Sequence, residues 1–272
     1  MDLLDGWRAA GVTRLSVGVQ AFDDEILRTL GRRYSADEAA RFCRSARRAG
    51  YDALAIDLMI GVPGETRNAV TRTLRTLLDL EPDHVSLYFL ENVEGLPFAE
   101  VLTRRPVDED AAVQSYERLR EALEKAGLLQ YEISNFAKAG KECRHNLKYW
   151  RYDPFLGLGP SACSHVGRER WCNTTALESW AEALAHGRSI RQEAVELSPE
   201  CAAREALVFG LRLVCGVDVA ELEARTGINV CSLYAREIDE LASDGLLIQA
   251  GARLWIPADK LLVSNAILSR FI

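Results

Sequence analysis

The chain lacks several features that would place it in a familiar class of protein. No apolar run approaches the roughly 18 residues that a membrane-spanning helix needs. The N-terminal segment has no basic stretch followed by an apolar one, as a secretory signal has. We therefore expect a cytoplasmic protein without an integral membrane segment. No internal repeat or low-complexity tract occurs, and 272 residues suffice for one large domain or two ordinary ones.

The chain also has no excess of positive charge and no paired cysteine motif. Its net charge of −7 disfavours broad contact with nucleic acid, which needs a basic surface. None of the seven cysteines is spaced as CxxC, so the sequence predicts neither a zinc ribbon nor a disulfide scaffold. We expect most of the cysteines to be buried small apolar residues in a reducing compartment.

What the chain does have is three short segments of alternating polarity: Arg14–Gln20, Ala53–Ile60 and residues 84–90. In each segment one side is apolar and the other is small or polar. A period of two predicts strands, and the amphipathic stretches between them predict βα units with a parallel sheet. A half-exposed antiparallel sheet is the plainer alternative. The intervening helices favour a parallel sheet that curves around a wet, ligand-holding lumen.

Other local signals predict the elements around these strands. Ser35 and Glu38 form a capping box at the start of one helix, and Thr66 can cap another. A long loop contains Gly95 and Pro97. Residues 138–175 are irregular and rich in glycine, histidine and aromatics, which is typical of a functional loop. The predicted helices cover residues 23–30, 36–48, 67–80, 108–125 and 178–186, and a fourth strand covers residues 131–136.

From Ser198 onward the pattern is that of a winged helix. Helices near residues 199–214, 219–225 and 232–243 precede a hairpin at residues 245–256, and a last helix covers residues 258–271. Residues 198–272 hold seven Lys and Arg against ten Asp and Glu, so this module is predicted to pack or bind a partner rather than DNA.

Three polar residues stand near the ends of the first two predicted strands. Gln20 and Asp57 lie on the polar faces of their strands, and Arg32 follows in the next connection. Ligands bind at the carboxyl ends of parallel strands. Asp57 can accept hydrogen bonds from a ribose or an ammonium group, and Arg32 can bind a carboxylate. The alternative is a purely structural Asp–Arg pair.

The segment Arg144–Trp150 is the densest group of candidate functional residues. His145 can offer a neutral imidazole to a metal, for example haem iron. In a helix, Tyr149 would share a face with His145, and Trp150 with Asn146. Aromatics beside a histidine suit a flat, apolar ring ligand. The alternative is an aromatic cluster that pins the loop, with His145 as a satisfied polar group.

A turn of glycines and small residues, 156–165, ends in Cys163 and His165. With Cys172 and His145 these could form a zinc-binding set, although the spacing matches no standard zinc signature. The glycines are also similar to a phosphate loop, but match neither GxGxxG nor a P-loop.

Five segments together resemble one family. In order they are RLSVGVQAFDDEILRTLGRRY, AIDLMIGVPGET, HVSLYFLENVEGLPF, QYEISNFAKAGKECRHNLKYW and FLGLGPSACSH. They are similar to the radical-SAM proteins related to oxygen-independent coproporphyrinogen III oxidase. The HNxxYW element, formed here by His145, Asn146, Tyr149 and Trp150, resembles the haem-binding signature of the HemW haem-chaperone branch.

The resemblance implies a TIM-type radical-SAM barrel that binds S-adenosylmethionine and a [4Fe–4S] cluster. It implies that Gln20, Arg32 and Asp57 contact S-adenosylmethionine, and that the HNxxYW residues bind haem, with His145 on the iron. The family's CxxxCxxC cluster motif is absent, so no cluster cysteines are present. We expect an α/β fold: a partial (β/α) barrel lacking its N-terminal strands over residues 1–195, then a winged-helix-like domain over residues 196–272.

The resemblance implies haem or porphyrin binding and delivery of haem to an acceptor protein. The alternative is an oxygen-independent coproporphyrinogen III oxidase, which makes protoporphyrinogen IX by radical decarboxylation and needs the cluster. A third alternative is an inactive remnant that keeps the second half of the fold.

Overall fold

The computed structural model describes residues 3–91 and 98–272, in two compact units. Unit 1 is Met1–Glu142 and unit 2 is Cys143–Ile272. The predicted loop with Gly95 and Pro97 lies largely outside the described residues. Within the two described ranges, no helix combines the length and the apolar character that crossing a bilayer requires.

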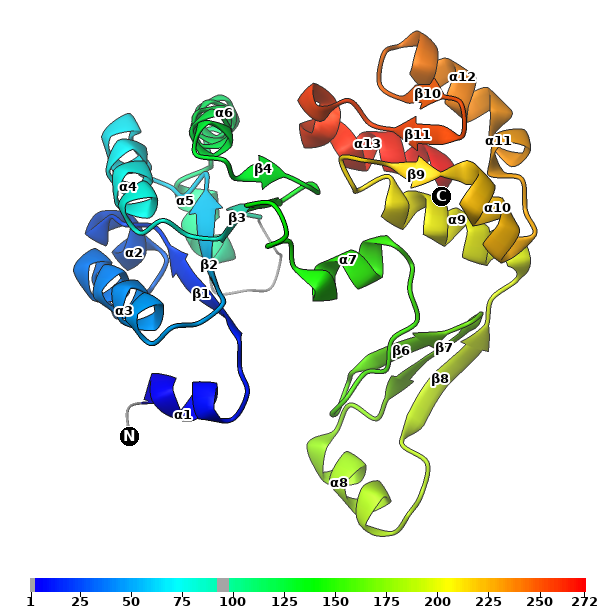
Figure 1. The fold of residues 1–272 in the computed structure, drawn as a ribbon, viewed down its shortest axis with the longest axis horizontal. Helices are drawn as coiled ribbons and strands as arrows, with labels where there is room; N and C mark the ends of the chain where they lie inside the picture. Colours follow the sequence, from blue (N-terminus) through cyan, green and yellow to red (C-terminus); the bar gives the residue numbers. More distant parts are fainter. Residues whose placement is uncertain (1–2, 92–97) are drawn as a thin grey trace. The chain divides into compact units, whose positions relative to one another are not determined.

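Unit 1 is built on a mixed five-stranded sheet in the order β1-β2-β3-β5-β4 (Figure 1). The first three strands run parallel, as their alternation and the helices between them predict. The predicted fourth strand at residues 131–136 is wrong, because two short strands flank a turn there and pair antiparallel. The strands are β1 (Arg14–Gln20), β2 (Ala53–Ile60), β3 (His84–Phe89), β4 (Leu129–Gln130) and β5 (Asn135–Ala137).

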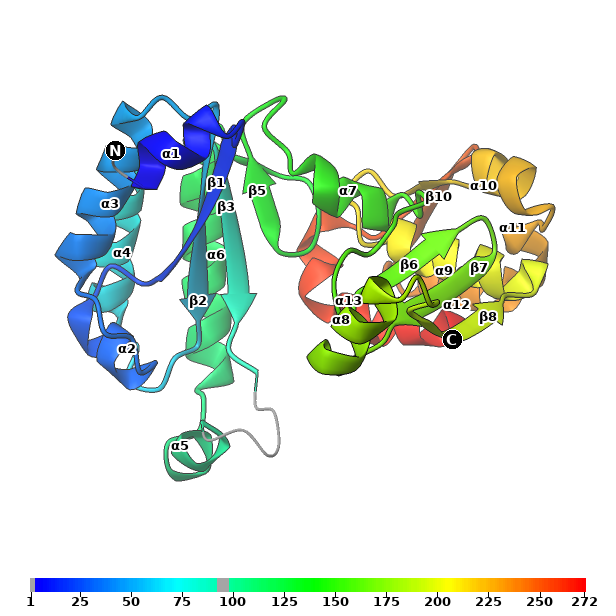
Figure 2. The same cartoon turned by 90° about the horizontal axis from the view of Figure 1, so that it is seen from below.

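Helices pack on the apolar face of this sheet (Figure 2). Leu54, Ile56 and Leu58 of β2 point into that layer and are at most 1% exposed. Each such side chain stabilises the fold by about 1.5–3 kcal/mol. The covered face leaves the polar face of the strands for a ligand. The helices of unit 1 are α1 (Leu3–Ala9), α2 (Asp24–Thr29), α3 (Ala36–Arg48), α4 (Arg67–Asp79), α5 (Ala99–Arg104) and α6 (Glu109–Lys125).

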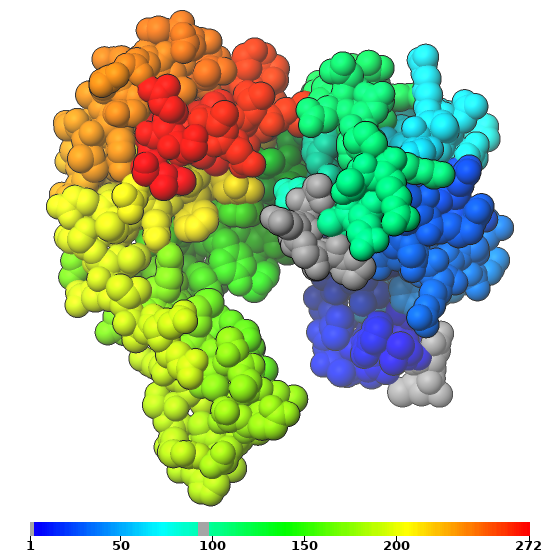
Figure 3. Space-filling model, turned by 180° about the vertical axis from the view of Figure 1, so that it is seen from behind, coloured from blue at the N-terminus to red at the C-terminus, as the bar shows by residue number. Residues whose placement is uncertain are grey.

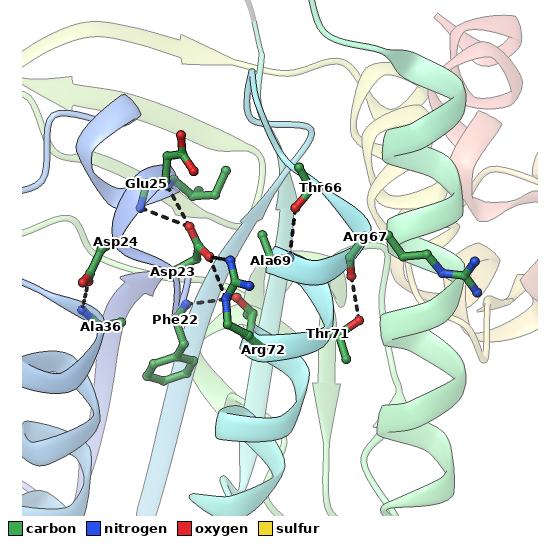
Figure 4. A network of polar contacts seen from close by, with 12 residues as sticks. Phe22, Asp23, Asp24, Glu25, Ala36, Thr66, Arg67, Ala69, Thr71 and Arg72 are labelled. Carbon is green, nitrogen blue, oxygen red and sulfur yellow. Dashed lines mark hydrogen bonds and ion pairs between the residues drawn. The ribbon is translucent and has the colours of Figure 1, made fainter.

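A polar network fixes the connection that follows β1 (Figure 4). Asp23 caps α2 by accepting hydrogen bonds from the backbone N–H groups of Glu25 and Ile26. Its other oxygen accepts from Arg72 on α4, whose Nε lies 3.0 Å away. The Phe22 backbone N–H donates to the Thr73 hydroxyl at 3.1 Å. The chain immediately after Gln20 is therefore tied to α4.

Unit 2 begins with α7 (Arg144–Trp150) and an antiparallel sheet of β6 (Cys163–Val166), β7 (Glu169–Asn173) and β8 (Arg191–Glu196). Helix α8 (Leu177–Ala185) lies between β7 and β8. In Figure 3 this yellow-green lobe extends away from the red and orange elements of the same unit. Three parts of the predicted irregular loop, α7, β6 and β7, are therefore ordered secondary structure.

Two expectations about the cysteines are wrong. Cys163 on β6 faces Cys172 on β7, and the two form a disulfide, although the sequence predicted none. Among the free cysteines only Cys43 is buried, and Cys215 is exposed. The expectation of mostly buried cysteines is therefore also wrong. Pairing across adjacent strands depends on register, which cysteine spacing alone does not reveal.

The C-terminal elements are three main helices and a small sheet, as the winged-helix pattern predicts. Hairpin β10–β11 gains β9 as a third strand. The predicted last helix is instead three short helical pieces. The elements are α9 (Pro199–Gly210), β9 (Val217–Asp218), α10 (Val219–Thr226), α11 (Val230–Leu233), α12 (Ala235–Ser243), β10 (Ile248–Ala250), β11 (Arg253–Trp255), η1 (Ala258–Val263), α13 (Ser264–Leu268) and η2 (Ser269–Phe271).

Candidate functional site

A row of small and polar residues crosses the uncovered face of the sheet in unit 1. Gly18 of β1 pairs with Asp57 of β2, Asp57 pairs with Ser86 of β3, and Ser86 pairs with Asn135 of β5. Residues that pair in register point to the same side of a sheet. The row therefore lines one face at one level, opposite the helices.

Asp57 is the only carboxylate in this row. The Ser16 hydroxyl lies 3.2 Å from each of its oxygens, and Ser86 also bonds to it. Burial raises the pKa of Asp57, although hydrogen bonds from Ser86 and Ser16 and the charge of Arg14 oppose that shift. Asp57 lies in the middle of β2 rather than at its end. No salt bridge among the described residues joins it to Arg32, so the predicted structural Asp–Arg pair is not formed.

Gln20 reaches this row by an irregular backbone. It ends β1 with a φ of +69°, and a register shift separates it from Gly18. A Cβ on Gly18 would lie only 3.0 Å from Gln20 Nε2, so the amide folds back over that glycine. The structure thus brings Gln20 and Asp57 together around Gly18. Gln20 Oε1 is buried without a hydrogen-bond partner, which leaves an acceptor for a ligand.

Arg32 lies on the connection between α2 and α3 and is exposed. The neighbouring Tyr34 hydroxyl donates to the Gly18 carbonyl at 2.8 Å. Burial raises the pKa of Tyr34, and the charge of Arg32 partly opposes this, so the guanidinium lies near that hydroxyl. Arg32 is therefore at the same end of β1 as Gln20, but no described hydrogen bond links it to Gln20 or Asp57.

The alternation of residues 84–90 predicts that His84 and Ser86 share the polar side of β3, but neither they nor Asn135 are predicted as site residues. His84 Nε2 pairs with the Tyr131 hydroxyl at 2.9 Å, and Nδ1 has no hydrogen-bond partner. Burial and the charge of Arg14 lower the pKa of His84 to about 3, so its ring is neutral. Asn135 Oδ1 is likewise buried and unpartnered. The alternation thus identifies the side on which His84 and Ser86 lie, whereas Asn135 carries no such signal.

These residues fit S-adenosylmethionine but not the iron–sulfur cluster. The ammonium group and the ribose hydroxyls of S-adenosylmethionine donate hydrogen bonds. Unpartnered carbonyl oxygens and a carboxylate can accept them. Cys43 is the one cysteine in unit 1, and it lies in the core, where burial raises its pKa to about 11. Across residues 3–91 and 98–272, no group of three His, Cys, Asp or Glu side chains can hold a metal ion.

In unit 2, the segment HNLKYW lies in helix α7, and its side chains divide between two faces. Tyr149 contacts His145 edge-on, with ring centroids 4.9 Å apart and the hydroxyl 3.2 Å from Nε2. Tyr149 also packs against Phe155, with centroids at 4.6 Å. His145 itself is exposed. This face therefore presents an accessible imidazole beside the Tyr149 ring, which is supported in turn by Phe155.

The other face of α7 is turned into unit 2. Trp150 packs near Phe209, with ring centroids 6.3 Å apart, and the Arg212 guanidinium lies 4.6 Å from the Trp150 ring. Asn146 is half-buried one helical turn before Trp150. Trp150 therefore anchors α7 within unit 2, whereas His145 is exposed.

The zinc-binding set considered from the sequence is wrong. Cys163 and Cys172 are consumed by their disulfide, and His165 is buried against Tyr152, with ring centroids 4.3 Å apart. The carbonyl oxygens of Gly157 and Gly159 accept hydrogen bonds from the Asn173 side chain, and the Gly157 backbone N–H donates to the Ser164 hydroxyl. The glycine turn is thus a structural connection to β6.

Comparison with known proteins adds two matching family models. The model described as "Radical SAM superfamily" matches residues 1–77, which hold β1, β2 and the site around Asp57. The model described as "HemN C-terminal domain" matches residues 197–259, which hold α9 to the hairpin.

Several curated relatives match nearly the whole chain. "Heme chaperone HemW" of Bacillus subtilis is 30% identical over 269 residues, covering 97% of this chain and 71% of its own length. The Escherichia coli protein of the same name is 31% identical over 279 residues, which cover 100% of this chain and 71% of the relative. The Mycobacterium tuberculosis protein of that name is 32% identical, and the match covers 96% of this chain and 65% of the relative. The chain is therefore shorter than these relatives.

One solved structure shares the fold. Coproporphyrinogen III oxidase (HemN) from Escherichia coli, described as a radical-SAM enzyme, superposes with a TM-score of 0.80 at 22% identity. The match covers 99% of this chain and 66% of that one.

Proposed function

We propose that this chain, which belongs to the radical-SAM family of HemN-like proteins and HemW haem chaperones, binds haem and delivers it to an acceptor protein. The observation that carries the proposal is the exposed His145 on α7, in edge-on contact with the ring of Tyr149, which packs in turn against Phe155. An accessible imidazole beside flat apolar surfaces suits a planar ligand with a central metal.

The geometry of α7 suggests how haem is held. Nε2 of His145 is engaged by the Tyr149 hydroxyl at 3.2 Å, so iron ligation by that nitrogen requires this hydrogen bond to break. The Tyr149 hydroxyl would thus compete with the iron for Nε2, which suits a haem that must be passed on to another protein. Trp150 and Asn146, on the other face, support the helix rather than touching the iron.

We also propose that the polar row of unit 1 binds S-adenosylmethionine. Asp57 would accept hydrogen bonds from its ribose or ammonium donors, Gln20 would contribute its amide, and Arg32 would face its carboxylate. S-adenosylmethionine supplies radical chemistry only with a reduced [4Fe–4S] cluster, which the described residues do not fit. No catalytic step is therefore assigned to this chain, and the haem chaperone is preferred to the oxidase.

We further propose that the sheet of unit 1 is part of a TIM-type barrel. The support is its three parallel strands, with helices on one face and polar side chains on the other. A division into a barrel portion over residues 1–195 and a winged-helix-like domain over residues 196–272 stays a prediction. So does a cytoplasmic location.

Haem titration of the purified chain tests the main proposal. We expect a stoichiometric Soret band, and we expect His145→Ala to weaken binding at least tenfold or shift the band. His186→Ala is a matched control, because His186 is also an exposed histidine of unit 2 but bonds only to the Glu182 carbonyl. Failure of the wild-type chain to bind haem would refute the proposal, and an unchanged His145→Ala spectrum would remove the iron-ligand role.

Tyr149→Phe tests the role of the hydroxyl. The variant keeps the aromatic ring but frees His145 Nε2, so we expect haem affinity to stay the same or rise and haem release to slow. Stopped-flow transfer of haem to an apoprotein in excess measures the release. Faster release from Tyr149→Phe would show that the hydroxyl supports the complex instead of competing with the iron.

A further inference from the structure

Unit 2 contains a cavity that the proposed haem-binding face of α7 does not use. Its volume is about 710 Å³, within the roughly 300–1,000 Å³ typical of small-molecule sites. The buried side chains of Ala206 on α9, Val217 on β9 and Leu222 on α10 form an apolar wall. Trp150 and Tyr152 add aromatic surface. The cavity therefore suits a ligand with a flat apolar body.

Two residues that line this cavity have buried polar atoms without a partner. His165 is 3% exposed, and its Nε2 makes no hydrogen bond. Burial and the charge of Arg170 lower the pKa of His165, although its bond to the Gly167 backbone opposes the shift, so the ring is neutral at pH 7. Trp150 Nε1, a donor only, is also unpartnered. A buried polar group without a hydrogen-bond partner lowers the stability of the fold unless a ligand or an ordered water molecule supplies the partner.

The charges on the cavity wall favour an anion. Arg225 donates to the carbonyl oxygens of Arg151 and Tyr152 at 2.9 and 2.7 Å, and Arg253 donates to that of Cys215 at 3.3 Å. Neither guanidinium joins a salt bridge within the described part of the chain. One cation and one carboxylate of the lining are already engaged, because Arg168 pairs with Glu196 and Asp218 caps α10, so three cations remain against two carboxylates. The charged lining residues are Arg151, Arg168, Arg225 and Arg253 against Asp153, Asp218 and Glu221.

We propose that this cavity binds a planar aromatic carboxylate, with its ring against Trp150 and Tyr152 and its carboxylate toward Arg225 and Arg253. Two sources share this chemistry: a free small aromatic acid, or a porphyrin bearing carboxylate side chains. Only the second source rests on the proposed function. The Trp150 indole N–H gives the bound carboxylate a further donor, and a bridging water can donate to His165.

Nuclear magnetic resonance of the full chain labelled with ¹⁵N-tryptophan tests the proposal. The indole signal of Trp150 is assigned by its absence in Trp150→Phe. We expect naphthalene-2-carboxylate to shift that signal at millimolar concentration, and we expect the uncharged naphthalene-2-carboxamide to bind at least tenfold more weakly. Absence of a shift with the carboxylate, or equal binding of the amide, would overturn the proposal.

Two variants locate the binding within the cavity. Ala206→Leu places a larger side chain in it and should abolish the shift, and Arg253→Gln should reduce the preference for the carboxylate over the amide. Arg236→Gln is the matched control, because Arg236 lies on α12 outside the cavity lining and pairs with Glu240. Thermal unfolding confirms that each variant is folded. Unchanged carboxylate binding by a folded Ala206→Leu chain would contradict the proposal.

Competition with protoporphyrin IX separates the two sources. Displacement of naphthalene-2-carboxylate by the porphyrin supports a porphyrin carboxylate as the occupant, and simultaneous binding of both supports a free aromatic acid. If the chain binds no haem but still shows the Trp150 shift, the proposed function fails while the cavity site stands. If haem binds and no shift occurs, the cavity proposal fails alone.

Discussion

At the scale of single residues, Asp57 bears a carboxyl group whose ionised form is disfavoured by its burial in the folded chain. Burial raises its pKa despite hydrogen bonds from Ser86 and Ser16. A carboxyl whose pKa is raised on folding contributes stability below its unfolded pKa, and that contribution is lost as pH rises through the folded value. The ionised Asp57 therefore destabilises unit 1 near neutral pH. Functional sites commonly accept such a cost to hold a ligand.

We predict that Asp57→Asn raises the melting temperature at pH 7 and removes this part of its pH dependence. The same variant should bind S-adenosylmethionine at least tenfold more weakly, because the amide lacks the carboxylate charge. Scanning fluorimetry between pH 4 and 8 and equilibrium dialysis measure the two effects. Asp52→Asn, at an exposed position of unit 1, should change neither. A destabilised Asp57→Asn chain with unchanged affinity would contradict both parts.

The sequence predicted the strand face of some candidate site residues and only the neighbourhood of others. Period-two alternation put Asp57 on the uncovered face, because an unbroken strand fixes the direction of every side chain. Gln20 was assigned the right neighbourhood, but its approach over Gly18 depends on a positive φ and a register shift. Asn135 was missed, because its strand has only three residues and shows no periodicity.

At the scale of elements, Asp83 joins α3, β2 and β3 at one end of the sheet. Burial would raise its pKa, but the Leu54 backbone N–H at 2.9 Å, Arg47 at 2.7 Å and the charge of Lys138 outweigh it and lower the pKa. A lowered carboxyl pKa contributes stability above the unfolded value, and that contribution is lost as pH falls through the folded value.

We predict that Asp83→Asn lowers the free energy of unfolding by about 2 kcal/mol at pH 7. The difference from wild type should shrink as the pH falls below about 4, the range in which an unperturbed aspartate is protonated. Urea titrations at several pH values measure it. The exposed Asp79 on α4 provides the control, since Asp79→Asn should cost almost nothing. A pH-independent loss for Asp83→Asn would show that its charge is irrelevant.

The small C-terminal sheet depends on one glycine. Gly216 has a φ of +64°, and a Cβ there would lie 2.1 Å from the Leu254 carbonyl oxygen. Gly251, in the β10–β11 turn, has a similar φ of +58° but open space around it. Substitution of Gly251 therefore introduces backbone strain alone, whereas substitution of Gly216 adds steric overlap to that strain.

We predict that Gly216→Ala destabilises unit 2 by more than about 3 kcal/mol, whereas Gly251→Ala costs about 1 kcal/mol. Denaturant unfolding followed by circular dichroism measures both. Equal losses in the two variants would mean that strain alone matters and that the close approach to Leu254 relaxes freely.

Long amphipathic elements were the most predictable. The capping box of Ser35 and Glu38 gave the start of α3, and Thr66 and Asp108 gave the starts of α4 and α6. The sheet of β6, β7 and β8 was not predicted. All of β8 is exposed, and β6 and β7 bury the polar residues Ser164, His165 and Asn173, so no apolar alternation marks these strands. Only pairing with neighbours defines them.

At the scale of the whole chain, the residues present accommodate one family ligand and not another. Unpartnered acceptors around Asp57 fit S-adenosylmethionine, while the lone cysteine of unit 1 is buried in its core. We predict that anaerobic incubation with ferrous iron, sulfide and thiol yields no stable cluster absorbance, and that haem binding is unaffected by the treatment. A stoichiometric [4Fe–4S] cluster on this chain would contradict the assignment.

The most direct test of the account is chemical rescue of the haem complex. The ferric Soret band of His145→Ala is recorded with and without added imidazole and compared with that of the wild-type chain. Ligation by His145 predicts an altered band in the variant that imidazole restores to the wild-type position. A variant spectrum identical to wild type before any imidazole is added would contradict haem binding through α7.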